Sequence, residues 1–169
     1  MERIISTERL ILRPLTVADA PDVFEWTGDP VVNKFMNYSI YENIDQVKKW
    51  ISQIKDEDNS FGYILKSTGK VIGSGSIRFN AQDNVYELGY NLNRAFWNHG
   101  FATEAAKALI KWAYENCGAR DFTAMHANEN TASGNVIRKC GFVFDKYGQY
   151  SKFDNSRTFE ASCYKLHLD

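Results

Sequence analysis

The apolar residues of the stretch 101–116 recur every three or four positions, which is the spacing of one face of an α-helix. Charged residues take the opposite face, where they can pair at i+3 and i+4: Glu104, Lys107, Lys111 and Glu115. A short polar stretch around Gly100 comes directly before this helix. The pattern predicts a long amphipathic helix that is entered through a tight loop.

The N-terminal part of the chain predicts a strand followed by a helix. Residues 8–13 have the composition of a strand, and Pro14 ends it because proline cannot donate to a sheet. Thr16 or Asp19 can cap the helix that follows. Pro21 favours the start at Asp19, since proline is tolerated only in the first helical turn.

An irregular aromatic stretch, residues 31–42, separates this helix from a second one. Asn43 or Asp45 begins the second helix, which ends in the polar run 55–60. Its apolar face is formed by Val47, Trp50, Ile51 and Ile54.

The middle of the chain predicts three strands, at 61–65, 71–79 and 85–92. Short turns join them, which is typical of an antiparallel meander. In the third strand one face carries Tyr86, Leu88, Tyr90 and Leu92. Glu87 lies on the other face, and a carboxylate in the middle of a strand is unusual because carboxylates are rarely buried without a partner.

The last part of the chain changes pattern. A strand at 121–127 follows the helix 101–116, and a strand–helix–strand crossover requires a parallel pair. A short helix at 132–140 and two strands at 142–147 and 159–168 complete the order β-α-α-β-β-β-α-β-α-β-β. This order predicts an α/β fold with a mixed sheet.

Composition narrows the class of protein. The 169 residues suggest one domain, 1–169, with a net charge of -1 and therefore no global basic field for nucleic acid or a membrane surface. The three cysteines lie far apart, without the spacing of a metal site or a disulfide framework, so a reducing compartment is expected. The first residues lack a long apolar segment, and we expect a soluble, cytoplasmic protein.

The loop before the long helix is a candidate anion site. The first amides of a helix have no intrahelical acceptor, and glycine lets a ligand approach the backbone. An ordinary loop–helix junction is the alternative. The Gly-Lys-Ser/Thr of a Walker loop and the three glycines of a dinucleotide fingerprint are both missing.

Four stretches then point to one family: 7–15, 86–90, 97–105, and 130–133 continued by 136–142. In this order and spacing they resemble the GNAT acyl-CoA N-acyltransferases, especially the branch of the ribosomal-protein alanine acetyltransferases (RimJ/RimL type). The resemblance implies a mixed, mainly antiparallel sheet flanked by about four helices. It also implies an N-acetyltransferase with acetyl-CoA as co-substrate and no metal.

By the same resemblance, the loop amides hold the pyrophosphate of coenzyme A: Asn98, His99, Gly100, Phe101, Ala102 and Thr103. The backbone of Tyr90, Asn91 and Leu92 would pair with the pantetheine amides, as an added strand does. Asn130 caps the following helix and reaches the pantetheine arm. Trp97 stands where the superfamily usually has Gln or Arg, although a tryptophan is usual for this branch.

Acetyl transfer to an amine needs a base, and two carboxylates are candidates. Glu87 is the first, on the strand that flanks the acetyl group in the resembling family; pairing with Arg78, or simple exposure to water, is its alternative. Glu160 is the second, four residues before Tyr164, where the branch tends to carry an acid. An exposed strand carboxylate is its alternative. Either acid can instead bind the ammonium group of the substrate.

Ser133 is the candidate hydrogen-bond or proton donor to the leaving thiolate. Many GNAT enzymes use a tyrosine of this helix, and this chain has none between Asn130 and Phe142. A first-turn serine that bonds only backbone is the alternative. His99 is expected to be exposed near phosphate rather than catalytic, and Cys140 to be packing.

The acceptor is left open by the sequence. A protein N-terminal α-amine is the first interpretation; a small amine or antibiotic, or a non-catalytic acyl-CoA-binding regulatory domain, are the alternatives. Aromatic residues of 31–42 and 145–158 are expected to wall the acceptor site: Phe35, Tyr38, Tyr41, Tyr147, Tyr150 and Phe153. The choice between monomer and homodimer stays open.

Overall fold

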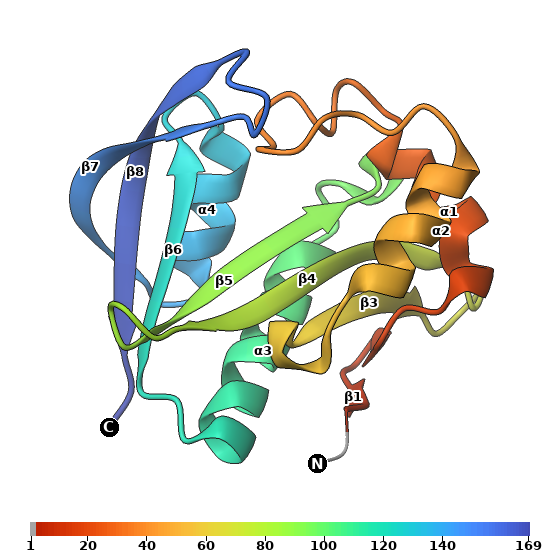
Figure 1. The fold of residues 1–169 in the computed structure, drawn as a ribbon. Helices are drawn as coiled ribbons and strands as arrows, with labels where there is room; N and C mark the ends of the chain where they lie inside the picture. Colours follow the sequence, from red (N-terminus) through yellow and green to blue (C-terminus); the bar gives the residue numbers. More distant parts are fainter. Residues whose placement is uncertain (1–2) are drawn as a thin grey trace.

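The computed structural model describes residues 3–169, which form one eight-stranded sheet with helices on both faces (Figure 1). The strand order is β1-β2-β3-β4-β5-β6-β8-β7. The strands are β1 (Ile5–Ser6), β2 (Leu10–Arg13), β3 (Ser60–Leu65), β4 (Val71–Asn80), β5 (Val85–Leu92), β6 (Asp121–Ala127), β7 (Val143–Ser151) and β8 (Thr158–His167). The helices are α1 (Ala20–Thr27), α2 (Ile44–Gln53), α3 (Phe101–Cys117) and α4 (Thr131–Lys139), with three short 3-10 turns. The predicted mixed α/β class is confirmed.

The helix boundaries follow from local chemistry. Asn43 is the N-cap of α2, and its side chain accepts a hydrogen bond from the Gln46 amide at 3.0 Å, which decides between the two predicted starts. Helix α1 begins after Asp19, with Pro21 in its first turn as expected. The strand predicted at 8–13 is shorter, because the Arg9 amide donates to the side chain of Glu104 instead of to a neighbouring strand.

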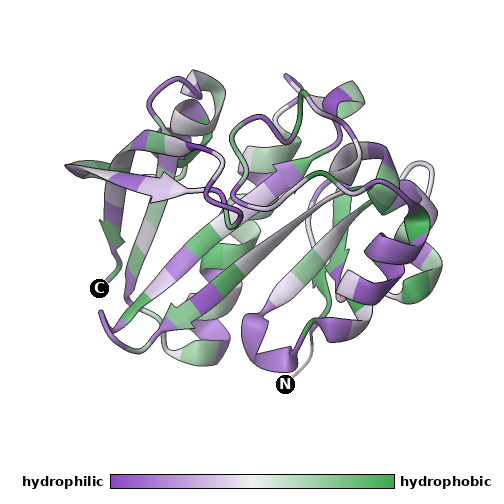
Figure 2. Ribbon diagram, turned by 45° about the horizontal axis from the view of Figure 1, so that its top comes forward, coloured by the Kyte–Doolittle hydropathy of each residue, from purple (hydrophilic) through white to green (hydrophobic). Residues whose placement is uncertain are grey.

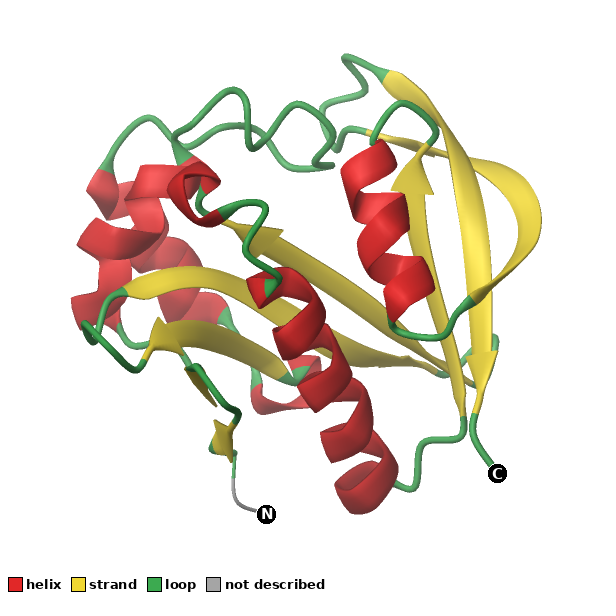
Figure 3. Cartoon of the chain, turned by 180° about the vertical axis from the view of Figure 1, so that it is seen from behind, coloured by secondary structure: helices red, strands yellow, loops and turns green. Residues whose placement is uncertain are grey.

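Two apolar clusters lie on opposite faces of the sheet. One packs the sheet against α3, through residues such as Leu109 and Phe122, and the other lies under α1 and α2, around Trp26 and Val47. Figure 3 shows α3 and α4 together on one face, and Figure 1 shows α1 and α2 on the other. Apolar and polar colours alternate along several strands in Figure 2, because successive side chains point to opposite faces.

The sheet opens between β5 and β6. Along residues 3–169 their parallel ladder consists of two residue pairs, Tyr86 with Phe122 and Glu87 with Thr123. Beyond these pairs β5 continues to Leu92 while β6 turns away from it, as Figure 1 shows. The strands on either side keep long antiparallel ladders, so each half of the sheet is held firmly. The fold thus places a wedge-shaped gap in the middle of the sheet.

Candidate active site

A cleft of about 1730 Å³ occupies the gap between β5 and β6 and reaches both faces of the sheet. Its walls come from the far half of β5, the loop before α3, the first turn of α4, and the aromatic stretch between α1 and α2. The motifs that lie far apart in the sequence therefore meet in one place.

The loop before α3 places a helix N-terminus on the cleft. Gly100 has φ of 79° and Asn98 has φ of 63°, a left-handed conformation that glycine and asparagine adopt most readily. The amides of Phe101, Ala102 and Thr103 form the first turn of α3, where amides have no intrahelical acceptor. All five of these residues line the cleft. The predicted anion loop thus has the open backbone and the positive helix end that a phosphate needs.

Trp97 fixes the entrance to this loop. Its indole Nε1 donates a hydrogen bond to the carbonyl of Leu92 at 2.9 Å, and its ring packs against both apolar clusters. The tryptophan thereby joins the loop to the end of β5. This structural role explains why a large aromatic residue can stand where a polar one is usual.

Glu104 supports the loop from behind, which the sequence reasoning missed. Its carboxylate accepts hydrogen bonds from the Thr7 hydroxyl at 2.6 Å and from the amide and Nε of Arg9 at 2.8 and 2.7 Å. Burial raises the pKa of Glu104, but the bonds from Thr7 and Arg9 outweigh it, and the pKa lies below its ordinary value. Arg9 also donates to the carbonyl of His99 at 2.8 Å. The first and third sequence motifs are therefore in direct contact.

Glu87 lines the cleft where β5 and β6 part, and its side chain is exposed. Its Oε1 accepts a hydrogen bond from Asn80 at 2.8 Å. Arg78 faces it in the β4–β5 ladder but forms an ion pair with Asp58 at 3.1 Å. The carboxylate is therefore hydrogen-bonded to a neutral amide and open to water.

Ser133 and Asn130 lie at the N-terminus of α4, beside the cleft. The Asn130 side chain caps the helix by accepting from the Ser133 amide at 3.3 Å, as expected. The Ser133 hydroxyl lies 2.7 Å from the hydroxyl of Tyr90, which reaches it from β5. Tyr90, Asn91 and Leu92 all line the cleft.

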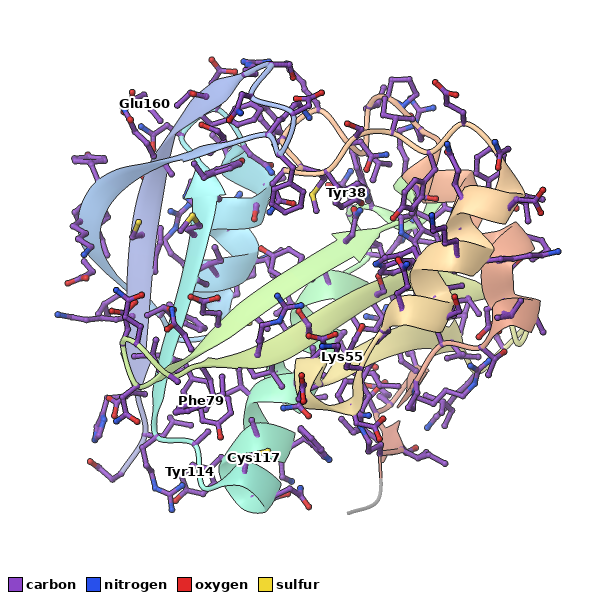
Figure 4. All side chains as sticks on the ribbon, viewed as in Figure 1. Tyr38, Lys55, Phe79, Tyr114, Cys117 and Glu160 are labelled. Carbon is purple, nitrogen blue, oxygen red and sulfur yellow. The ribbon has the colours of Figure 1, made fainter. Side chains whose placement is uncertain are left out.

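Two of the predicted site residues lie elsewhere. Glu160 is exposed on β8, accepts a hydrogen bond from Gln149 at 2.7 Å, and is not among the described residues that line the cleft. Figure 4 shows Glu160 at the outer end of β8, apart from Tyr38 near the end of β5. The His99 side chain is exposed and is also absent from that lining, although its carbonyl bonds to Arg9.

Tyr38 and its aromatic neighbours form a wall of the cleft, which we call the aromatic wall. It faces β5 on the side of the sheet that carries α1 and α2. Tyr38 accepts a hydrogen bond from the Asn91 side chain at 2.5 Å, and its ring stacks on Tyr41 with centroids 6.0 Å apart. Burial raises the pKa of Tyr38 above its ordinary value. Of the six aromatic residues expected here, five line the cleft, and Tyr147 does not because it lies on the opposite face of β7, paired with Ser162.

A bridge crosses the mouth of the cleft. The amide of Phe153 donates to the carbonyl of Asn37 at 2.7 Å, and the Tyr150 hydroxyl donates to the carbonyl of Phe35 at 2.6 Å. These bonds join the segment 31–42 to the hairpin of β7 and β8, which touch at the top of Figure 1. The bridge therefore restricts this side of the cleft.

Within residues 3–169, no group of three or more His, Cys, Asp or Glu side chains is placed to hold a metal ion. No helix in the described part of the chain is long and apolar enough to cross a membrane.

Comparison with known proteins places these features in context. A model of the acetyltransferase (GNAT) domain matches residues 9–143. The uncharacterized N-acetyltransferase p20 of Bacillus licheniformis is 33% identical over 142 residues, which is 80% of each chain.

Two solved structures share the fold. The ribosomal-protein-S5-alanine acetyltransferase of Vibrio fischeri has a TM-score of 0.79 at 16% identity and covers 98% of this chain and 97% of its own. The microcin C7 self-immunity acetyltransferase MccE, in complex with acetyl-CoA and AMP, has a TM-score of 0.82 at 18% identity and covers 95% and 93%. At these identities the likeness shows the fold alone.

Proposed function

The chain belongs to the GNAT acetyltransferase family and is an acetyltransferase, and we propose that it moves the acetyl group of acetyl-CoA to a primary amine by direct attack. The proposed acceptor is the α-amine of a protein or peptide N-terminus. One observation carries the proposal: a single cleft passes through the sheet, with a helix N-terminus at one side and the exposed carboxylate of Glu87 at the other. Donor and acceptor can therefore meet from opposite faces.

The donor half of the cleft suits coenzyme A. Asn98 and residues 100–103 line the cleft at the positive end of α3, and Gly100 offers backbone without a side chain in the way. Beyond Glu87, β5 has a free side toward β6, where the pantetheine amides can pair with Tyr90, Asn91 and Leu92 as an added strand. Asn130 lies at the same gap. The acetyl-CoA complex of the structural neighbour MccE supports this assignment.

The acceptor half favours an α-amine over a lysine. At pH 7, deprotonating an α-amine of pKa about 8 costs roughly 1.4 kcal/mol, whereas a lysine near 10.4 costs roughly 4.6 kcal/mol. Glu87 is exposed and bonded to Asn80, so it suits proton removal through a water molecule better than strong, desolvated base catalysis. An acceptor with the lower pKa needs no more than this.

A small amine is the second candidate acceptor. The bridge formed by Asn37 and Phe153 restricts the mouth of the cleft, and the aromatic wall around Tyr38 offers apolar surface for a compact molecule. An extended N-terminal segment needs a narrower opening than a folded protein surface does. The two candidates thus differ in size and not in the chemistry of the amine.

Direct attack uses no thiol nucleophile. The three cysteines, Cys117, Cys140 and Cys163, are free thiols, and of these Cys163 lines the cleft. Burial raises the pKa of Cys140 to about 11, so little of that residue is thiolate at neutral pH. Free thiols are typical of reducing compartments, which supports the proposed cytoplasmic location.

An acceptor screen by mass spectrometry tests the proposal. The enzyme and acetyl-CoA are incubated with a lysine-free peptide that has a free N-terminus, with the same peptide blocked at its N-terminus and carrying one lysine, and with small primary amines. We expect one acetyl group on the free N-terminus and none on the blocked peptide. Acetylation of the lysine alone would overturn the α-amine assignment, and acetylation of the small amines alone would establish the second candidate.

A further inference from the structure

The hydroxyl groups of Tyr90 and Ser133 form a pair inside the cleft that the proposed roles of these residues do not use. The two oxygen atoms are 2.7 Å apart, and the Tyr90 hydroxyl is also 3.0 Å from the Ser133 carbonyl oxygen. Tyr90 comes from β5 and Ser133 from the first turn of α4, so the contact spans the gap where the thioester is proposed to lie. The Tyr90 hydroxyl therefore has no role in the proposed binding of coenzyme A, which uses the Tyr90 backbone.

The two hydroxyls can share their two protons in two ways. In the first, Tyr90 donates to the Ser133 carbonyl and the serine hydroxyl donates to the tyrosine oxygen. In the second, Tyr90 donates to the serine oxygen, and the serine proton is free to point into the cleft. Both arrangements use the same heavy-atom positions, so rotation of two O–H bonds interconverts them. Negative charge in the cleft favours the second arrangement, because Tyr90 then donates to Ser133 and the serine hydroxyl donates to the charge.

The surroundings hold Tyr90 in place and protonated. Its ring packs against the core on the face of the sheet that α3 covers, and burial raises the pKa of Tyr90 well above its ordinary value. On the neighbouring strand, Gly75 pairs with Tyr90 and leaves room for the buried Tyr63 side chain, whose hydroxyl lies where a Cβ on Gly75 would be. Ser133 is fixed in turn by the cap to Asn130. The phenol is therefore a neutral donor at neutral pH.

We propose that Tyr90 is a positioning residue for the leaving group: it donates to Ser133, so that the serine hydroxyl donates to the sulfur of coenzyme A. The inference rests on the proposed function. As the amine nitrogen bonds to the carbonyl carbon, the C–S electron pair leaves on sulfur, and the amine proton passes through a water molecule to Glu87 and from there to solvent. Both hydroxyls keep their own protons and stabilise the thiolate by hydrogen bonds. The pair takes the place of the helix tyrosine that this chain lacks.

The bound product, coenzyme A, reports on this pair without any acceptor. Hydrogen bonds to a thiolate lower the pKa of the thiol, and the ultraviolet absorbance of the thiolate follows its titration in the complex. The variants are Tyr90→Phe, Ser133→Ala and the double variant. The matched control is Tyr86→Phe, which removes a phenol hydroxyl from the same face of the same strand, where it donates to the Cys117 carbonyl.

Differences between variants are compared, because other titratable groups lie near the pair. His126 of β6 and Tyr164 of β8 contact each other beside Gly134 of α4, Arg138 donates to Tyr164, and Cys140 is electrostatically coupled to Tyr90. All of these groups are unchanged in the four variants. A common offset therefore cancels in the comparison with the wild type.

We expect Ser133→Ala to raise the pKa of the bound thiol by about one unit, and Tyr90→Phe to raise it by a similar or smaller amount. The double variant should match Ser133→Ala, and Tyr86→Phe should match the wild type. An unchanged pKa in Tyr90→Phe, or additive shifts in the double variant, would overturn the relay. A larger shift in Tyr90→Phe than in Ser133→Ala would place tyrosine itself on the sulfur and also overturn it. If coenzyme A does not bind the wild type, the proposed function fails as well.

Discussion

Glu104 and Arg9 are joined by two hydrogen bonds, from the Arg9 amide at 2.8 Å and from its Nε at 2.7 Å, although 95 positions separate them in the chain. Arg9 extends the contact to the carbonyl of His99, and its guanidinium lies 4.1 Å from the centre of the Phe101 ring. The segment before β2 therefore acts as a brace behind the loop that is proposed to hold pyrophosphate. Glu104 thus has two roles: its negative charge suits the first turn of α3, and its carboxylate anchors the segment before β2.

Replacing Glu104 with Gln should loosen this brace. The variant loses the charged acceptor for Arg9 and Thr7, and we expect a loss of about 2 kcal/mol in the free energy of unfolding together with weaker acetyl-CoA binding. Urea unfolding and calorimetric titration measure the two effects. Glu115→Gln is the control. Glu115 is exposed on α3 and its ion pair with Lys111 is long, at 3.8 Å, so the substitution should lower the free energy of unfolding by less than about 0.5 kcal/mol. Equal losses in the two variants would contradict the brace.

The same carboxylate predicts a dependence of stability on pH. Because the pKa of Glu104 in the folded protein lies below its ordinary value, the folded state binds fewer protons there than the unfolded state. Its contribution is therefore complete above the ordinary pKa of 4.5 and is lost as the pH falls through the folded value. Between about pH 6 and pH 3, the unfolding free energy of the wild type should fall more steeply than that of Glu104→Gln. Parallel curves would show that the pKa of Glu104 is the same in the folded and unfolded states, which would contradict the prediction.

Gly75 should tolerate no side chain. A Cβ there would lie 1.9 Å from the Tyr63 hydroxyl and 2.8 Å from the Gly89 carbonyl, so Gly75→Ala should destabilise the fold by about 1–3 kcal/mol. Adding Tyr63→Phe removes the hydroxyl and should recover part of the loss. Gly89→Ala is the control in thermal unfolding, because its Cβ would meet only the Ser76 oxygen at 3.6 Å. A harmless Gly75→Ala would show that the Tyr63 hydroxyl does not fill the space beside Gly75.

Periodicity predicted most of the fold because most elements are amphipathic. The strands at 85–92 and 121–127 have the predicted bounds, and the crossover between them is parallel as expected. The two-residue strand Ile5–Ser6 was not predicted, since so short a segment has no period. Strand β7 extends to Ser151, beyond the predicted end, because it pairs along nearly all of β8 through a bulge that sequence spacing does not show.

The site was harder to predict, because contacts across the gap depend on where two strands part. The face of Tyr90 was predicted from strand alternation, but its contact with Ser133 follows from the position of α4. A hydroxyl among apolar neighbours was the available signal, since buried tyrosines usually find a partner. Glu160 lies four residues before Tyr164 on β8 and therefore shares its face. Phe159, on the opposite face, is the residue that stacks on Tyr150 of the aromatic wall. Family likeness alone could not show this orientation.

Replacing Glu87 with Gln should lower the rate more than the affinity. The amide cannot accept the acceptor's proton, and we expect kcat to fall about 100-fold or more, which is the usual scale for a general base. Acetyl-CoA affinity, measured by titration, should change less than about twofold, because no donor-binding group is altered. Asp83→Asn is the control, since Asp83 bonds to the same Asn80 and shares its surroundings. An unchanged rate in Glu87→Gln would remove Glu87 from the mechanism.

The central claim is that acetyl-CoA and the amine occupy the cleft together and react directly. Initial rates measured while the concentrations of both substrates are varied test it most directly, with an acceptor identified in the screen. Direct attack requires both substrates to be bound at once, so double-reciprocal plots should give lines that intersect. Parallel lines, together with release of coenzyme A before any acceptor is added, would indicate an acetylated enzyme intermediate and contradict the account.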